Sequence, residues 1–154
     1  PCTPKGCMEL IDYYNIDVKG LNAVIIGCSN LVGLPLSMML LHRKATVTIC
    51  HKETKNIKSV VRNADLLVTC CGVPQLVKED WIKEDIIVID IGINKIEDNT
   101  KKNGYRLVGD TDFENIIENV SKITPVPGGV GPMTITMLLQ NVLKAYTNST
   151  KIQI

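Results

Sequence analysis

The sequence predicts an α/β fold in which a doubly wound, mostly parallel sheet carries helices on both of its faces. Three observations support this prediction. Short runs of Val, Ile and Leu recur along the chain, as in strands that are buried on both faces. Helix-like segments alternate with these runs through short connections, which is typical of right-handed strand–helix–strand units. Turns rich in glycine and proline follow the first and the last of the runs.

Length and composition fit one globular domain that spans residues 1–154. Hydrophobic residues make up 45% of the chain and charged residues 21%, and a fold of this size buries roughly 70% of its unfolded surface. The net charge of +1 argues against a nucleic-acid partner. No apolar run approaches the roughly 20 residues that span a bilayer, so we expect no membrane partner. The chain begins at Pro1 rather than Met, which we interpret as the start of a fragment of a longer protein.

The six cysteines do not indicate a metal site. None of them forms a Cys-x-x-Cys pair, and no Cys/His spacing fits zinc. Scattered cysteines in apolar segments are typical of small buried side chains in a reducing compartment. We therefore expect no bound metal and a cytoplasmic location, with an organelle as the alternative.

The elements of the first half can be assigned in order. Thr3 and Pro4 are suited to cap a first helix, whose apolar face recurs at helical spacing through residues 7, 10, 11 and 14. The elements expected after it are a strand at 23–27, a helix at 35–43, a strand at 46–50, a helix at 54–63 and a strand at 65–71.

The second half continues the alternation up to a final helix. The elements expected here are a strand at 86–91, a short strand at 107–109, a helix at 113–120 and a strand at 122–125. Pro132 is suited to the first turn of the last helix, where its missing N–H costs nothing. An apolar stripe marks that helix at Ile135, Leu138, Leu139 and Val142.

The turn GCSNLVGLP at residues 27–35 lies where a dinucleotide-binding fold places its phosphate loop, between the first strand and the next helix. Gly27 permits a tight turn, and Gly33 permits close packing of the helix. Ser29 stands where the usual fingerprint has a glycine, and its hydroxyl can contact a phosphate. The strict Gly-x-Gly-x-x-Gly pattern fails, so a glycine-flanked turn without a ligand is the alternative.

The end of the second strand bears on the choice of cofactor. NAD-binding folds tend to place Asp or Glu there to hold the ribose hydroxyls, but this strand ends with Cys50, His51 and Lys52. A cation at Lys52 would attract the 2′-phosphate of NADP. The alternative is that His51 and Lys52 are ordinary surface residues.

The segment TPVPGGVGPMT at residues 124–134 is the most constrained stretch of the chain. Its prolines fix the backbone, and its glycines let the chain approach a ligand closely. The N–H groups of the following helix would favour a carbonyl or negative oxygen in the glycine turn. The alternative is a rigid connection that serves packing only. We expect the bends near Ser29 and Gly129 to meet at one rim of the sheet and to flank one dinucleotide.

Five blocks of the sequence resemble the cofactor-binding domain of the methylenetetrahydrofolate dehydrogenase/cyclohydrolase family. They are PCTPKG at 1–6, GCSNLVGLP at 27–35, VIDIGIN at 88–94, Gly-Asp at 109–110 and TPVPGGVGPMT at 124–134. The resemblance implies a Rossmann-like fold and a bifunctional enzyme of one-carbon metabolism. One activity oxidises 5,10-methylenetetrahydrofolate with NADP, and the other hydrolyses 5,10-methenyltetrahydrofolate to the 10-formyl form.

The resemblance also implies which residues form the site. The expected cofactor-binding residues are Gly27, Cys28, Ser29, His51, Lys52, Gly72, Ile93 and Thr134. The expected substrate-binding residues are Pro127, Gly128, Gly129, Val130 and Gly131. The family commonly has arginine at the position of Cys28 and often serine at that of Lys52. We hypothesise that Lys52 replaces the lost charge and keeps NADP as the cofactor, with NAD as the alternative.

The catalytic pair of the family is absent from this chain. The family carries a Tyr-x-x-x-Lys pair in an N-terminal domain, and no tyrosine here is followed four residues later by lysine. We therefore expect no catalytic residue in this chain, and an isolated chain that binds dinucleotide but catalyses neither step. The implied partners are tetrahydrofolate derivatives, the missing N-terminal catalytic domain and, for the complete enzyme, a second copy. A stand-alone dinucleotide-sensing module and another NADP-dependent dehydrogenase domain remain as alternatives.

Two further carboxylates follow predicted strands. Asp90 is placed to orient the turn at 92–94, and Asp110 is placed either to cap a helix or to touch a ligand.

Overall fold

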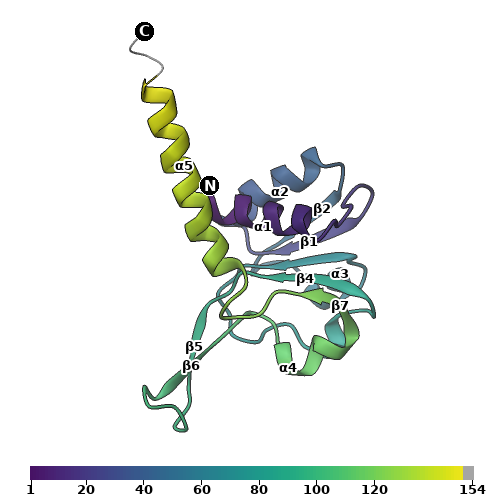
Figure 1. Ribbon diagram of the computed structural model, residues 1–154. Coiled ribbons are helices and arrows are strands. Elements are labelled where there is room, and N and C mark those ends of the chain that lie inside the picture. The colour runs from purple at the N-terminus through teal and green to yellow at the C-terminus, as the bar shows by residue number, and fades with distance from the viewer. Residues whose placement is uncertain (151–154) are drawn as a thin grey trace.

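A five-stranded parallel sheet forms the centre of this computed structural model, which describes residues 1–150 (Figure 1). The order of its strands across the sheet is β2-β1-β3-β4-β7. All neighbouring strands run parallel, so their carboxyl ends lie at one edge. The strands are β1 (Asn22–Ile26), β2 (Thr46–Cys50), β3 (Leu66–Thr69), β4 (Ile86–Asp90) and β7 (Val120–Ile123). The predicted Rossmann-like, doubly wound fold is therefore confirmed.

Helices bury both faces of the sheet. Helices α1 (Cys2–Tyr13) and α2 (Gly33–His42) cover one face, while α3 (Ile57–Val61) and the 3-10 helix Glu79–Trp81 lie on the other. Alternate residues of strand β1 pack against the helices on opposite faces of the sheet. Ala23 and Ile25 pack in the cluster under α1 and α2, whereas Val24 and Ile26 pack in the opposite cluster. Continuous apolar strands are the expected consequence of burial on both faces.

A two-stranded antiparallel hairpin projects from the carboxyl edge of the sheet (Figure 1). It consists of β5 (Asn94–Glu97) and β6 (Tyr105–Val108). Strand β5 was not predicted from the sequence. The short strand predicted at 107–109 is wrong in its bounds, because β6 spans Tyr105–Val108. It is also wrong in its placement, because β6 pairs with β5 and not with the main sheet. Strand β5 follows β4 after only three residues, too few for the crossover that a parallel partner requires, so it pairs with β6 instead.

Several predicted boundaries are also wrong. The helix expected at 54–63 is confined to α3, because Asn56 before it adopts a left-handed backbone conformation. The helix expected at 113–120 divides into α4 (Phe113–Ile116) and the 3-10 helix Ile117–Asn119. Strand β7 begins at Val120 rather than at residue 122. Helix α1 begins at Cys2 without a side-chain cap.

The last helix, α5 (Val130–Thr150), leaves the body of the molecule and packs against α1 near its base (Figure 1). The hydroxyl of Thr134 donates a hydrogen bond of 3.0 Å to that of Thr3, and Lys5 donates to Gln140 at 2.8 Å. The residues that α5 buries are Val130 and Met137. No helix within residues 1–150 combines the length and the hydropathy that a membrane crossing needs.

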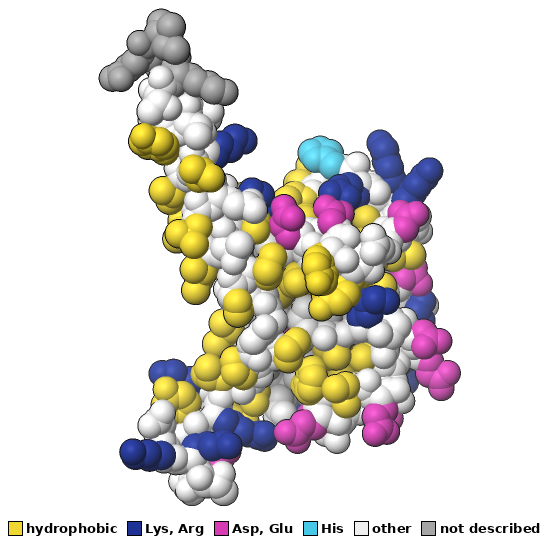
Figure 2. All heavy atoms as spheres, viewed as in Figure 1, with side chains coloured by type: hydrophobic (Ala, Val, Ile, Leu, Met, Phe, Trp, Pro, Cys, Tyr) yellow, Lys and Arg dark blue, Asp and Glu magenta, His cyan; other side chains and the backbone are white. Residues whose placement is uncertain are grey.

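The predicted apolar stripe lies on the exposed side of α5. Its exposed large hydrophobic residues are Ile135, Leu138, Leu139, Val142, Leu143 and Tyr146. Figure 2 shows hydrophobic side chains along this helix above the body of the molecule. The apolar stripe is therefore present as predicted, but it is exposed and is not buried by any part of the chain that the structure describes.

Candidate functional site

The carboxyl ends of β1, β2 and β3 surround a cavity of about 620 Å³. The chain runs from β1 outward to β2 and then returns to β3 on the other side of β1, so the strand order reverses at this point. Ligands of open α/β sheets bind at such switch points. The predicted residues that line the cavity are Gly27, Cys28, Ser29, His51 and Lys52.

The turn after β1 requires glycine at both of its ends. Gly27 has a φ of +123°, and a Cβ there would lie 2.5 Å from the carbonyl oxygen of Cys70. A Cβ on Gly33 would lie 2.0 Å from the carbonyl oxygen of Gly27. The packing around this turn therefore excludes a side chain at either glycine, and the bare backbone lets a phosphate approach closely.

Ser29 is placed to donate a hydrogen bond into the cavity. Its Oγ accepts a hydrogen bond of 3.2 Å from the amide of Val32, and the side chain is exposed. This bond uses a lone pair and leaves the hydroxyl proton available for an anionic oxygen. Cys28 beside it is an exposed, free thiol.

Lys52 is the main positive charge of the cavity. Its side chain is 89% exposed, and its only ion pair with a described residue is a contact of 3.8 Å with Glu53. An exposed pair of that length contributes little, so the ammonium is available to another anion. The Nδ1 of neighbouring His51 accepts a hydrogen bond of 3.3 Å from the amide of Glu53, which fixes the ring at the start of the turn.

Two thiols at the carboxyl end of β3 also line the cavity. Burial is the main cause that raises the pKa of Cys70 to about 12, and neighbouring acidic groups add to it. Burial and the nearby Asp110 carboxylate raise the pKa of Cys71 to about 11. Both are therefore protonated at neutral pH and offer a neutral, unreactive wall to a ligand.

The constrained loop that follows β7 lines a second cavity of about 460 Å³ at the same edge. Its lining includes the five predicted substrate residues together with Ile93. A Cβ on Gly129 would lie 2.6 Å from the carbonyl oxygen of Pro125, so the loop folds closely on itself. The side chain of Val130 is only 3% exposed and packs in the core, so this residue can offer a ligand little beyond its backbone.

A buried pair of carboxylates joins these loops to each other. Asp90 accepts hydrogen bonds from the amides of Gly92, Asp110 and Thr111 at 2.8 to 3.0 Å, as its predicted turn-orienting position implies. Desolvation raises the pKa of Asp90, although these hydrogen bonds act in the opposite direction. The backbone amide of Asp90 donates to the Thr124 hydroxyl at 2.8 Å, which links β4 to the constrained loop.

Asp110 ties three further segments together. Its carboxylate accepts hydrogen bonds from the amides of Cys71 at 2.7 Å and Gly72 at 3.0 Å, and from the Asn94 side chain at 2.8 Å. Its side chain is fully buried and caps no helix, so the helix-capping alternative is wrong. This positioning role of Asp110 was not predicted from the sequence. The only available signal was that an acidic residue directly follows a glycine at the end of a strand.

Two of the predicted cofactor-binding residues line neither the first cavity nor the second. Gly72, with a φ of +70°, directly follows Cys71 and is exposed. The hydroxyl of Thr134 is engaged with Thr3 and with the carbonyl of Val130. The geometry therefore gives Thr134 a role in holding α5 against α1.

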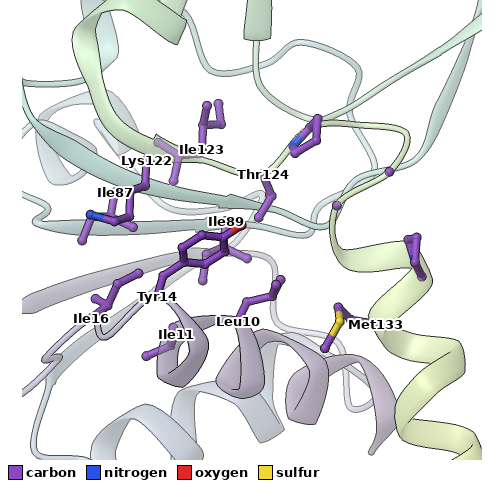
Figure 3. A pocket seen from close by; sticks show the side chains of 15 residues that line it. Leu10, Ile11, Tyr14, Ile16, Ile87, Ile89, Lys122, Ile123, Thr124 and Met133 are labelled. Atoms are coloured by element: carbon purple, nitrogen blue, oxygen red, sulfur yellow. The ribbon is translucent and has the colours of Figure 1, made fainter.

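An apolar groove of about 520 Å³ opens beside the constrained loop, between α1, β4, β7 and the start of α5. Figure 3 shows Tyr14 over Ile89, with Leu10 and Met133 closing the side toward α5. The groove shares Gly128 and Gly129 with the second cavity. Its lining is apolar apart from Lys122 and Thr124, so it favours packing rather than polar chemistry.

No group of three or more potential metal ligands occurs among the residues that the structure describes. The donors at the edge of the sheet are hydroxyls, amides and cationic side chains. Such a set suits the phosphates of a nucleotide.

Comparison with known proteins links the whole described chain to one family. Residues 1–150 match the family described as "Tetrahydrofolate dehydrogenase/cyclohydrolase, NAD(P)-binding domain". The chain is 54% identical over 145 residues to the mitochondrial C-1-tetrahydrofolate synthase of Saccharomyces cerevisiae, covering 94% of this chain and 15% of that protein. It is 50% identical over 149 residues to the bifunctional protein FolD of Chlorobium phaeobacteroides, covering 94% of this chain and 50% of that protein.

A solved structure agrees with the sequence comparisons. The methylenetetrahydrofolate dehydrogenase-cyclohydrolase of Trypanosoma brucei, described as complexed with NADP cofactor and inhibitor, superposes with a TM-score of 0.92 at 41% identity. The match covers 97% of this chain and 51% of that chain. The chain thus spans about half the length of its bifunctional relatives or less.

Proposed function

Because the chain belongs to the tetrahydrofolate dehydrogenase/cyclohydrolase family, as its NAD(P)-binding domain, we propose that it binds NADP for a bifunctional folate enzyme. The observation that carries the proposal is the cavity at the strand-order reversal, lined by the glycine turn, Ser29 and Lys52. The shape and charge of this site fit the cofactor, since the two glycines leave room for a pyrophosphate and Lys52 offers a cation to a 2′-phosphate.

The two cavities suit the two ends of one dinucleotide. The loops after β1 and β7 lie on the same edge of the sheet, separated by three strand spacings, or about 14 Å. We propose that the adenosine end lies near Lys52 and that the nicotinamide lies near Ile93 and the loop at 127–131. Bound NADP supplies a hydride acceptor. The residues of this chain hold its ring against the substrate, which is a task of orientation.

The substrate assignment follows the family. We propose that the complete enzyme oxidises 5,10-methylenetetrahydrofolate to the methenyl form and hydrolyses that product to 10-formyltetrahydrofolate. Pro127, Gly128, Gly129 and Gly131, together with the backbone of Val130, are proposed to contact the folate beside the nicotinamide. Water activation in the hydrolysis requires a positioned acid or base, and we assign it to the N-terminal half.

The exposed stripe on α5 supports the proposed N-terminal partner. A row of six large hydrophobic side chains is unusual on a monomer and is typical of a surface that packs against another domain. Since the chain spans about half of its FolD relative, we propose that the N-terminal catalytic half covers this stripe. A homodimer of the complete enzyme is proposed from the family resemblance.

We propose a cytoplasmic location, because the six cysteines are free thiols and a reducing compartment preserves them. A relative named as mitochondrial leaves an organelle as the alternative.

Calorimetric titration of the 154-residue chain with NADP and with NAD tests the cofactor proposal. We expect both to bind, because the glycine turn recognises features that they share, and we expect NADP to bind more tightly through Lys52. Equal affinities would contradict the NADP preference. Failure of both to bind would contradict the dinucleotide site itself.

A further inference from the structure

The hairpin β5–β6 concentrates positive charge beside the proposed folate-binding loop. Between residues 94 and 108 the chain has four cations and two carboxylates, whereas the whole protein has a net charge of only +1. Figure 2 shows Lys and Arg side chains gathered on this projecting part of the molecule. This charge has no part in the dinucleotide site described above.

Three of the four cations of the hairpin line a further cavity. It measures about 500 Å³, and Lys101, Lys102 and Arg106 line it together with Leu107 and Pro127. Arg106 forms long ion pairs with Asp98 at 3.9 Å and Glu114 at 3.5 Å. Neither Lys101 nor Lys102 forms an ion pair with any residue in the described part of the chain. The two lysines are therefore the cations available to a ligand.

This basic cavity borders the proposed substrate cavity. Leu107 and Pro127 line both of them. A ligand that lies against the loop at 127–131 can therefore extend past Pro127 toward the basic cavity.

We propose that Lys101 and Lys102 bind the glutamate tail of the folate substrate. This inference rests on the proposed function, since tetrahydrofolates end in a p-aminobenzoylglutamate whose carboxylates are ionised at neutral pH. A tail lengthened by γ-linked glutamates adds a further carboxylate with each residue. The basic hairpin is built for a ligand whose negative charge grows along an extended chain, and each added carboxylate strengthens its binding.

The test compares tails of different length on the 154-residue chain saturated with NADP. The probes are p-aminobenzoyl-monoglutamate, p-aminobenzoyl-tri-γ-glutamate and free tri-γ-glutamate, titrated while the amide NMR signals of the hairpin are followed. We expect the longer aminobenzoyl probe to bind roughly 3- to 10-fold more tightly than the shorter one, as a few exposed ion pairs allow. The advantage should shrink as salt is added.

The double variant Lys101→Gln/Lys102→Gln should reduce this advantage to less than about twofold, because it removes the unpaired charges. The matched control is Lys19→Gln/Lys44→Gln, which removes two exposed lysines in turns at the amino edge of the sheet and should keep the advantage. NADP affinity should be the same in both variants and in the parent chain.

The proposal would be overturned by equal binding of the two aminobenzoyl probes, by an advantage that survives in the hairpin variant, or by no binding of either probe. Equally tight binding of free tri-γ-glutamate would also overturn it, since the hairpin would then be a general anion patch. The NADP titration separates the two levels of inference. Loss of NADP binding contradicts the proposed function, whereas normal NADP binding without any effect of tail length contradicts the tail site alone.

Discussion

Asp110 illustrates how one buried residue can organise a site. Its buried carboxylate holds the loop after β3 through two amides and the base of the hairpin through Asn94. A Cβ on Gly92 would lie 2.2 Å from the same carboxylate, so that glycine is required by the packing. A sequence shows neither relation, because the partners of Asp110 lie up to 39 residues away.

The sequence was more informative about residues whose role is local. Gly27 and Gly33 were assigned to a tight turn and close packing, and the structure confirms both geometries. Thr134 differs, because its hydroxyl bonds to Thr3 on a helix 131 residues away. Backbone constraint can be recognised from residue type and spacing, but the partner of a polar side chain depends on the tertiary fold.

Lys52 provides the test of cofactor choice at the residue scale. We expect Lys52→Ala to weaken NADP binding by roughly five- to twentyfold, or about 1–2 kcal/mol, through loss of a charged contact to the 2′-phosphate. NAD binding should change by less than about twofold, since NAD lacks that phosphate. Calorimetry of both cofactors with the parent and the variant measures the difference.

Lys19→Ala is the matched control, because Lys19 is an exposed lysine at the opposite edge of the sheet. It should leave both affinities unchanged. The hypothesis that Lys52 replaces the charge missing at Cys28 is wrong if Lys52→Ala weakens NADP and NAD to the same extent.

Helix α5 shows what a periodic pattern can and cannot reveal at the scale of an element. The stripe at Ile135, Leu138, Leu139 and Val142 correctly predicted a helix. The same stripe is exposed, and the side that packs on the domain carries Met137. Periodicity identifies an apolar face, but it does not identify which body that face contacts.

Substitutions on the exposed face and on the buried face of α5 should have different effects on stability. Leu138→Gln/Leu139→Gln should change the free energy of unfolding of this chain by less than about 0.5 kcal/mol, because both side chains are exposed. Met137→Ala should lower it by about 2–5 kcal/mol, because a buried side chain leaves a cavity. Urea denaturation followed by circular dichroism measures both effects.

The exposed pair should matter when the N-terminal half of a FolD relative is supplied as a separate chain. We expect the parent chain to bind that half and Leu138→Gln/Leu139→Gln to lose the interaction. Undiminished binding by the double variant would contradict the assignment of this stripe. Self-association of the parent chain through the stripe, seen by analytical ultracentrifugation, would contradict it in favour of a second copy.

The hairpin β5–β6 was the element least accessible from sequence. Each of its strands has four residues, and the turn between them is polar, so the apolar pattern is too short to identify a strand. The alternation of strands and helices along the rest of the chain also favoured one continuous parallel sheet. The antiparallel hairpin β5–β6 is a single interruption of that alternation.

At the scale of the molecule, the fold was predictable because its signals are long and repeated. Three of the five strands of the sheet, β1, β3 and β4, contain continuous apolar runs, and both helical layers follow from the alternation of strands with helices. The position of the site then followed from topology, since parallel strands collect their following loops at one edge. The separation of that edge into distinct cavities depended on side-chain packing and was not predictable.

The prediction that the catalytic pair lies in the N-terminal half can be tested with the isolated 154-residue chain. We expect the isolated chain to bind NADP yet to reduce none of it when 5,10-methylenetetrahydrofolate is added, because no Tyr-x-x-x-Lys pair is present. Absorbance at the wavelength of reduced cofactor measures the reaction. Adding the N-terminal half of a FolD relative should restore turnover, and that half alone is the control.

Turnover by the isolated chain would show that this half contains its own catalytic group. Tight cofactor binding without restored turnover would instead favour the stand-alone sensing module.

The parallel arrangement of the sheet has a consequence for how such a domain can diversify. Lys52 follows β2, the constrained loop follows β7, and the hairpin follows β4. Substitutions at separated sites without shared partners usually combine additively. Nucleotide preference at Lys52 and affinity for a charged tail at Lys101 and Lys102 can therefore be adjusted independently, by evolution or by design, without repacking the strands.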